Sequence, residues 1–493
     1  MLLQLPNEEK VYWNGEAFRK MTNLRILIVE NAHFSQSPNH LPNSLRVLDW
    51  KNYPSPFLPP DFDPKNLVVL NLHDSRFELD KSFDYKKYKC LMYMDLTHCV
   101  SLEEVPDISE IANLVEFYLD HCQNLVKVHD SVGLLDKLVK ISAKHCDNLN
   151  TFITKIESTS LQYLNLRGCG KLTRFPAFSD KMEKIRFIDV GATAIKELPS
   201  SFENLVGIEA LHIGKCRKLR VLPSGFLMFQ NLKELNMGFC PKLQTSFGKL
   251  RDDNQVEPSI TLQLVSLNVQ FCDLSDEDVF MILSCFSKLK ELIPIRATHC
   301  PKLTTQSSNL LLNQGLNEIH NLTVTVDGGD IPLWFDHHKK GGSLSFHVRK
   351  KFPVIALGSV LGATCEIFQV QISLFINEIE VYVFEASLWT KGEDTTWLHD
   401  IRAHISIQQW EKLNTYLINK EWNLVQVSFT LSTGVTKWCG VHAYKQEPSK
   451  VIVTQISMKG GVLVDKKTKT PLLKGAKSKM LAKGEGDTNK EHY

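Results

Sequence analysis

One phrase recurs along the middle of this 493-residue chain at a nearly fixed interval. It begins with leucine, carries apolar residues three and five positions later, and places cysteine eight positions later, as in Leu91–Cys99, Leu114–Cys122 and Leu161–Cys169. Apolar residues at alternate positions predict a short strand with one buried face. Because no single copy can bury that face alone, the copies must stack against one another.

The first residues of the copies, here termed anchors, are separated by 21 to 24 residues. This is the period of leucine-rich repeats. It predicts an α/β solenoid, a horseshoe with a parallel β ladder along its concave side. Repeats 1 to 10 are numbered by their anchors, which are Leu24, Leu45, Leu67, Leu91, Leu114, Leu138, Leu161, Ile185, Ile208 and Leu232.

Changes of pattern along the chain predict four segments. Residues 1–23, with helical spacing over Glu16–Asn23, are interpreted as a joint to an upstream domain, because they lack the polar outer face of a terminal repeat. Residues 24–315 hold about 12 repeats, including a polar insertion near 246–260, a helical pattern after Asp276 and a distorted last repeat from Leu289 to Leu303. Alternating apolar residues over 320–445 predict an all-β antiparallel sandwich, of the jelly-roll or Ig-like kind.

The remaining segment, residues 446–493, carries ten lysines against five acidic residues. A basic end of this composition predicts a disordered, solvated tail. Six of the eight tryptophans lie between Trp334 and Trp438, and we expect most of them to anchor the core of the sandwich.

Seven cysteines share one position of the repeat, eight residues after the anchor. They are interpreted as buried fillers whose S–H groups bond backbone atoms of the turn. A metal site would need closely spaced ligand pairs such as C-x₂-C, which the chain lacks. These structural cysteines are Cys99, Cys122, Cys146, Cys169, Cys216, Cys240 and Cys272.

A histidine precedes the cysteine in three consecutive repeats, at His98, His121 and His145. Paired strands should bring these histidines to about 5 Å from one another. In extended chain an inward cysteine implies an outward histidine, so the two should not share a metal. Ordinary solvated side chains are one interpretation, and a pH-sensitive column is the other, because stacked imidazoles resist joint protonation.

Residues between the buried positions of each repeat should face the concave side. They are polar, mixed in sign and irregular, which suits contact with a macromolecule better than catalysis in a pocket. Solvation alone is the simpler explanation for any single one of them. The candidate protein-contact residues are Tyr118, Asp120, Lys144, Tyr163, Arg167, Phe187 and Phe239, together with Trp397 and Trp410 in the second domain.

Composition argues against several functional classes. A formal net charge of +2 gives no reason to expect nucleic-acid or membrane-surface binding. No apolar run approaches the roughly 18 residues of a membrane-spanning helix, and the start lacks a signal peptide pattern.

No Gly-x-Ser-x-Gly elbow, phosphate loop or metal-ligand cluster is present, so we expect no enzyme activity and no cofactor. A cytoplasmic protein with reduced thiols is expected, with the nucleus as the alternative location.

Several stretches resemble plant TIR-type NLR disease-resistance proteins. The first is Trp13–Leu27, followed by Leu41–Trp50 and then the cysteine ladder. In the second domain, Gly329–Phe335, Arg349–Leu357 and Trp438–His442 resemble the C-terminal jelly-roll and Ig-like domain that follows the repeats in this family. Together these stretches cover the chain to about Lys445.

The resemblance implies the recognition part of an intracellular immune receptor. Its repeats and post-repeat domain would contact a pathogen effector, and its repeats would restrain a nucleotide-binding domain of the same or another chain. The family's TIR domain and phosphate loop are absent from this sequence, so NAD hydrolysis and ATP or ADP binding are not carried over. The chain is therefore expected to be a fragment, a truncated product or a recognition half.

Three other functions remain open at this stage. A substrate adaptor of a ubiquitin ligase would need an F-box-like helical segment, for which the first twenty residues are too short. A stand-alone decoy or helper protein would use the same repeats without the missing domains. An extracellular receptor fragment is disfavoured by the absence of a signal peptide pattern.

Overall fold

The computed structural model describes most of the first half of the chain and separate stretches of the second. The first part comprises residues 1–79, 84–223 and 229–243. The second comprises residues 266–269, 272, 294–296, 323–327, 335, 337–349, 351–353, 355–362, 367–389, 394–401, 407–418, 422–443, 456–459 and 462–465. The chain divides into two compact units, Met1–Leu311 and Leu312–Tyr493, here termed the repeat domain and the sandwich domain.

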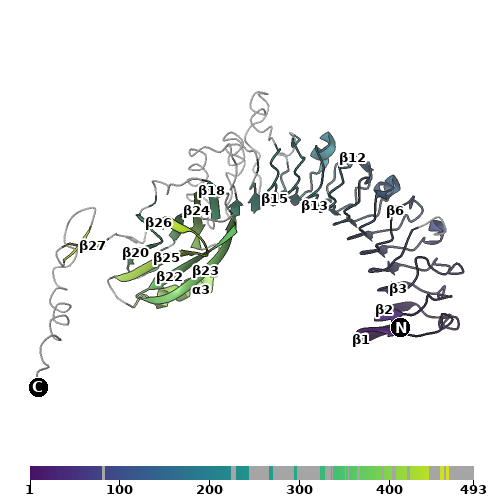
Figure 1. Cartoon of the computed structure of the whole chain (residues 1–493). Helices are drawn as coiled ribbons and strands as arrows, with labels where there is room; N and C mark the ends of the chain where they lie inside the picture. Colours follow the sequence, from purple (N-terminus) through teal and green to yellow (C-terminus); the bar gives the residue numbers. More distant parts are fainter. Residues whose placement is uncertain are drawn as a thin grey trace, which may run out of the picture. The chain divides into compact units, whose positions relative to one another are not determined.

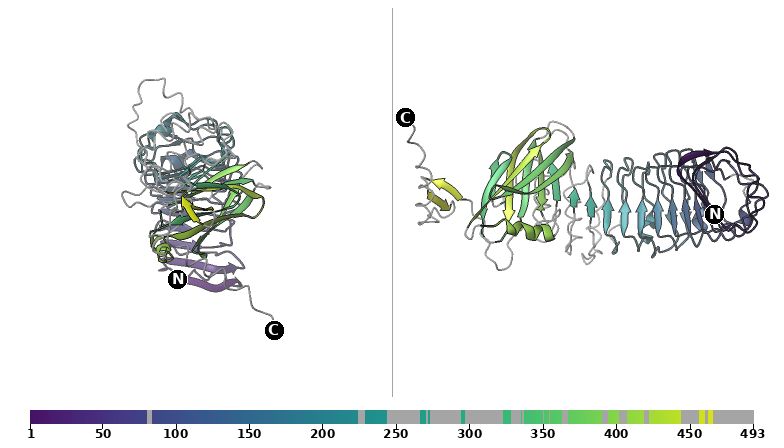
Figure 2. Two further views of the ribbon diagram at one scale, coloured as in Figure 1. Left: turned by 90° about the vertical axis from the view of Figure 1, so that its left-hand side faces the viewer. Right: turned by 90° about the horizontal axis from the view of Figure 1, so that it is seen from below.

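The repeat domain is a ladder of short parallel strands, as predicted. The strands of repeats 1 to 10 each begin two residues after their anchor, and consecutive strands pair in unbroken register, so that Met94, Phe117 and Ile141 lie side by side. Figure 1 and the right-hand view of Figure 2 show the strands stacked in a row. They are β2 (Ile26–Phe34), β3 (Val47–Trp50), β4 (Val69–Asn71), β5 (Tyr93–Asp95), β7 (Glu116–Tyr118), β9 (Lys140–Ser142), β11 (Tyr163–Asn165), β13 (Phe187–Asp189), β14 (Ala210–His212), β15 (Glu234–Asn236), β16 (Ser266–Asn268) and β17 (Pro294–Arg296).

The core of the repeat domain is formed by the anchor and by the residues three and five positions later. In repeat 4 these are Leu91, Met94 and Leu96, each with no exposed surface. The convex side is closed by short strand pairs and 3₁₀ turns, which commonly serve as connectors. These elements are η1 (Tyr85–Lys87), β6 (Glu104–Val105), β8 (Lys127–Val128), η2 (Asp130–Leu134), β10 (Lys155–Ile156), β12 (Ala177–Phe178) and η3 (Ser200–Asn204).

The first 23 residues differ from the prediction. Leu2–Val11 forms strand β1, which pairs in parallel with β2 and adds one more strand to the ladder. The predicted helix over Glu16–Asn23 is instead a series of tight turns, in which the amides of Ala17, Arg19 and Met21 each bond the carbonyl three residues earlier. Helical spacing over so few residues does not distinguish a helix from consecutive turns, because a short helix gains little from its few hydrogen bonds.

The sandwich domain contains two antiparallel sheets. One has the order β18–β24–β21–β26–β19 and the other β20–β25–β22–β23. Their bounds are β18 (Thr323–Asp327), β19 (His337–Lys340), β20 (Ser343–Val348), β21 (Ile355–Gly362), β22 (Ile367–Ile376), β23 (Ile379–Trp389), β24 (Thr395–Asp400), β25 (Asn423–Leu431) and β26 (Val435–Ala443). Helix α3 (Ile407–Thr415) lies between β24 and β25 in the chain.

Apolar residues of both sheets meet in one core. It includes Phe346 from β20, Phe368 from β22, Trp397 from β24 and Val441 from β26, with Leu413 of α3 packed against them. This packing of two sheets face to face confirms the predicted antiparallel all-β domain.

Some predicted segments lie outside the described residues. They are the insertion at 246–260 and the helical pattern after Asp276. Within the distorted repeat from Leu289 to Leu303, only strand β17 is described. In the basic tail, Ile456–Lys459 and Val462–Asp465 form an antiparallel pair, β27 and β28. The predicted disorder of the tail stays a prediction.

Candidate protein-contact surface

Two local devices turn the chain off its strands. In several repeats the side-chain oxygen four residues after the anchor accepts a hydrogen bond from the backbone N–H two residues later, as at Asp95, Asn165 and Asp189. The residue seven after the anchor then adopts a positive φ, which is 60° at His98 and 65° at Phe239. Asp and Asn favour such turns because a short side chain can replace a backbone hydrogen bond.

The next residue is the cysteine, and its side chain points inward. All seven cysteines of the column are buried. Each thiol donates to the carbonyl oxygen of the residue that directly follows the strand of the preceding repeat, over 3.0–3.4 Å. Burial raises the pKa of the six thiols from Cys99 to Cys240, to about 12 for Cys99, Cys169 and Cys240. The column therefore holds protonated thiols that link neighbouring repeats.

The three histidines form a stack on the outer side of the same turn. The rings of His98 and His121 lie 4.5 Å apart and those of His121 and His145 lie 5.0 Å apart, with interplanar angles of 3° and 19°. They face away from the cysteines because they occupy a left-handed turn, and not because the chain is extended. Burial lowers the pKa of His121, and the charges of His98 and His145 lower it further.

Aromatic side chains stand on the concave face two residues after the anchors of repeats 7 and 8. Tyr163 and Phe187 stack with centroids 4.7 Å apart and planes within 8°. The ring of His212 follows, with its centroid 5.3 Å from that of Phe187 and the two planes at 80°. All three side chains are partly exposed. Nearer the N-terminus, Tyr93 and Tyr118 form a similar pair at 5.6 Å.

An ion-pair network lies beside the aromatic stack. Asp189, whose side chain is 5% exposed, lies 3.4 Å from the Arg167 guanidinium and 3.6 Å from His212 Nδ1. Burial raises the pKa of Asp189, but hydrogen bonds from His212 and the Gly191 amide and the charge of Arg167 lower it more, so the net pKa is below the ordinary range. The bond to Asp189 in turn raises the pKa of His212.

The predicted contact residues divide into exposed and structural ones. Tyr118, Lys144, Tyr163, Phe187 and Phe239 are partly exposed and Arg167 is exposed, all in the repeat domain. Asp120, in contrast, is only 7% exposed. Its carboxylate accepts bonds from the Ser142 hydroxyl and the Lys144 amide of the next repeat, so its first role is to hold the turn.

In the second domain, two tryptophans were predicted to contact a partner, and the structure treats them differently. Trp397 is 1% exposed and stacks on Phe384 inside the sandwich core. Its assignment as a contact residue is therefore wrong, because a partner cannot reach it. Trp410 belongs to α3, and the structure does not describe its side chain.

Sequence reasoning missed a hollow of about 80 Å³ on the concave face of repeats 7 to 10. Its rim includes Arg167, His212, Lys215, Asn236 and Phe239. Its lining also includes three glycines six residues after their anchors: Gly191, Gly214 and Gly238. Glycine at the same position of three consecutive repeats is the sequence pattern that could have indicated this hollow.

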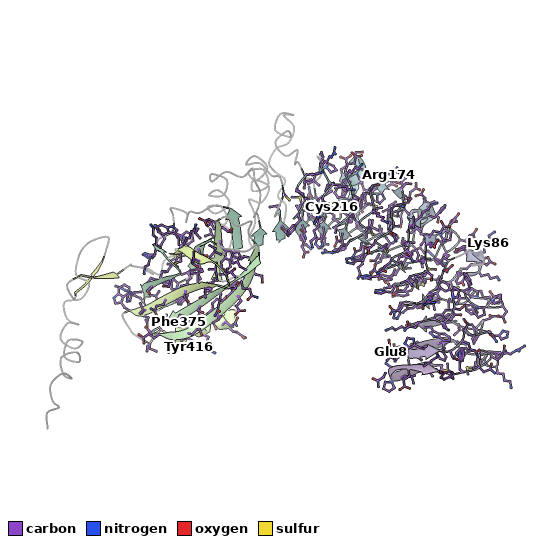
Figure 3. All side chains as sticks on the ribbon, in the orientation of Figure 1. Glu8, Lys86, Arg174, Cys216, Phe375 and Tyr416 are labelled. Atoms are coloured by element: carbon purple, nitrogen blue, oxygen red, sulfur yellow. The ribbon has the colours of Figure 1, made fainter. Side chains whose placement is uncertain are left out.

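Figure 3 places side chains on both faces of the repeat domain, with Arg174 on the outer side and Cys216 within. Among the described residues, no group of three or more His, Cys, Asp or Glu side chains could hold a metal ion. No helix in the described part of the chain has the length and hydropathy needed to cross a membrane.

The fold and the cysteine-lined ladder define a leucine-rich-repeat protein with a C-terminal β-sandwich domain. Residues 158–303 match the family of leucine-rich repeats described as disease resistance protein RPS4B-like. Disease resistance protein RPP2A of Arabidopsis thaliana is 34% identical over 215 residues, which cover 41% of this chain and 16% of that protein. Disease resistance protein RML1B of the same plant is 27% identical over 347 residues, covering 67% of this chain and 32% of that protein.

These matches confirm the resemblance to TIR-type plant disease-resistance proteins over the repeats. The chain spans less than a third of the length of these relatives. Among solved structures, a leucine-rich-repeat protein of Leptospira interrogans, LIC12759, matches 66% of this chain and 84% of its own at 17% identity. The TM-score of this match is 0.33.

Proposed function

We propose that this chain is a non-enzymatic recognition module of an intracellular plant immune receptor. In this proposal the concave face of the repeats and the sandwich domain bind a pathogen effector, and binding contributes to defence signalling. The nucleotide-binding domain of the same or another receptor chain is the second protein partner. The proposed location is the cytoplasm, with the nucleus as the alternative.

The stacked pair Tyr163 and Phe187, with Arg167 beside it, is the observation that carries this proposal. Along β11 and β13 the residue that points into the solenoid is buried and apolar, whereas the first outward position of each strand holds a partly exposed aromatic ring. Aromatic and arginine side chains contribute most of the binding energy in protein interfaces. The relatives' names support a role in disease resistance for proteins that contain such repeats.

The test uses the full chain and a panel of proteins secreted by plant pathogens, screened by split-luciferase complementation in plant cells. We expect at least one of them to bind. Combining Tyr163→Ala, Phe187→Ala and Arg167→Glu should weaken that binding by roughly 30-fold or more, as expected for an interface hot spot.

Arg174→Glu is the matched control. It reverses an exposed arginine of the same repeat, but on the outer side, and should leave binding unchanged. If the triple variant bound as well as the native chain while both remained folded, the concave face would not be the contact surface.

A further inference from the structure

Charged side chains are unevenly divided along the concave face. At the positions two, four, six and seven residues after the anchors, repeats 1–5 carry six acidic side chains and one lysine, a formal charge of −5. Repeats 6–10 carry four basic and two acidic side chains, a formal charge of +2. In chain order the residues are Glu30, Asp49, Lys51, Asp74, Asp95, Glu116 and Asp120, then Lys140, Lys144, Arg167, Asp189, Lys215 and Glu234.

Two ion pairs mark the border between these halves. Lys140 reaches Glu116 and Lys144 reaches Asp120, each over 3.2 Å, and both pairs join repeat 6 to repeat 5. Farther into the acidic half the carboxylates affect one another. Burial raises the pKa of Asp49, and the charges of Glu30 and Asp95 raise it further.

The basic half contains the hollow of about 80 Å³. At the position six after the anchor, repeats 4–7 carry Thr97, Asp120, Lys144 and Arg167, and repeats 8–10 carry glycine. A Cβ on Gly214 would lie 2.8 Å from Asn236 Oδ1 and 3.1 Å from the Gly238 carbonyl, so no larger residue fits there without displacement. The volume of the hollow exceeds the ~10–15 Å³ that one buried water needs, so the hollow has room for a small side-chain group.

Two basic side chains beside the hollow, Lys215 and Arg167, are available to bind a ligand. Asp189 is already bonded by Arg167, His212 and the Gly191 amide, and Glu234 lies 3.5 Å from His212 Nε2. Lys215 is exposed and forms no ion pair within the described part of the chain. Arg167 has one carboxylate neighbour at 3.4 Å and its side chain is 44% exposed.

We propose that a protein partner lies across this face in one orientation, with basic side chains over repeats 1–5 and a carboxylate side chain in the hollow beside Lys215. Complementary charges fix the register and orientation of a partner and reject reversed docking. This inference rests on the proposed recognition function and names the chemistry of its partner.

The test uses two synthetic probe peptides that differ only in alternate lysine or glutamate residues between glycines. Each carries a photoreactive benzophenone, and cross-links to the full chain are mapped by mass spectrometry. The lysine peptide should label repeats 1–5 and the glutamate peptide repeats 6–10, each about fivefold over the opposite half, the factor expected for one exposed ion pair. High salt should remove the preference.

Lys215→Glu should reduce labelling around the hollow by the glutamate peptide about fivefold or more, because it removes one exposed ion pair and adds a like charge. Lys218→Glu is the matched control, because it makes the same charge change three residues away, outside the hollow, and should preserve labelling. Identical maps for both peptides, or equal effects of the two variants, would overturn the inference. These probes require no immune partner, so failure here leaves the effector test standing, and failure of that test does not alter the labelling pattern.

Discussion

The Cys146 thiol donates a hydrogen bond to the carbonyl oxygen of Leu119, 3.0 Å away and 27 residues earlier in the chain. Leu119 directly follows the strand of repeat 5, β7, whereas Cys146 lies in the turn of repeat 6. The same bond, repeated at each cysteine of the column, connects neighbouring repeats just beyond the ends of their paired strands.

Cys146→Ala should lower the stability of the repeat domain. It removes the thiol bond and leaves a small cavity in a fully buried site, for an expected loss of about 1–2 kcal/mol. The measurement is the midpoint of thermal unfolding followed by circular dichroism. Cys90→Ala alters an exposed cysteine and should leave the midpoint almost unchanged. Equal midpoints for the two variants would show that the inter-repeat bond does not stabilise the fold.

Thiol alkylation should distinguish Cys90 from the column. Burial raises the pKa of the column thiols, and only the thiolate reacts. Iodoacetamide at neutral pH should therefore modify Cys90 well before Cys99 or Cys122, as read by peptide mass spectrometry. Urea should remove the difference. Rapid alkylation of Cys122 in the native chain would contradict its burial.

The histidine stack should make the repeat domain less stable in mild acid. Because the pKa of His121 is lowered in the folded chain, the unfolded chain binds the proton first as pH falls below about 6.5. Stability is therefore full above that pH and decreases below it, until the folded-state pKa is passed. His121→Asn tolerates the positive φ and removes the charge, so it should reduce this loss. NMR titration that gave ordinary, independent pKa values for the three histidines would disprove the coupling.

Asp189→Asn should lower the pKa of His212. The bond to the Asp189 carboxylate is the largest cause of the raised pKa, and the amide keeps the shape but not the charge. Histidine NMR titration of the full chain gives the measurement. Glu234→Gln should have a smaller effect, because the charge of Glu234 ranks below the Asp189 contributions and its side chain is 56% exposed. A larger effect of Glu234→Gln would reassign the main partner of His212.

Gly133→Ala should strongly destabilise the convex side. A Cβ at Gly133 would lie 2.1 Å from the Lys155 carbonyl oxygen, a backbone atom that cannot move freely. Overpacking of this kind costs about 1–3 kcal/mol. Gly170→Ala is the control, because no atom lies within 4 Å of its Cβ. Thermal unfolding of both variants should show a lower midpoint for Gly133→Ala alone.

The sequence by itself determined the parts of this protein that depend on local periodicity. The spacing from Leu91 to Cys99 predicts a strand, a turn and an inward thiol, and each of these features follows from residues fewer than ten positions apart. The repeat interval of 21 to 24 then requires stacking, because a single repeat cannot cover its own apolar face. Alternation over Ser343–Val348 predicts a strand of the sandwich in the same way.

Tertiary structure alone decided which polar side chains remain available to a partner. Asp120 and Arg167 occupy equivalent positions, yet the first is held by Ser142 and Lys144 of the next repeat and the second is exposed. Strand β1, the burial of Trp397 and the hollow beside Lys215 likewise depend on contacts between residues far apart in the chain. Hydrogen bonding and burial in each repeat are completed by its neighbours, so they cannot be read from the repeat itself.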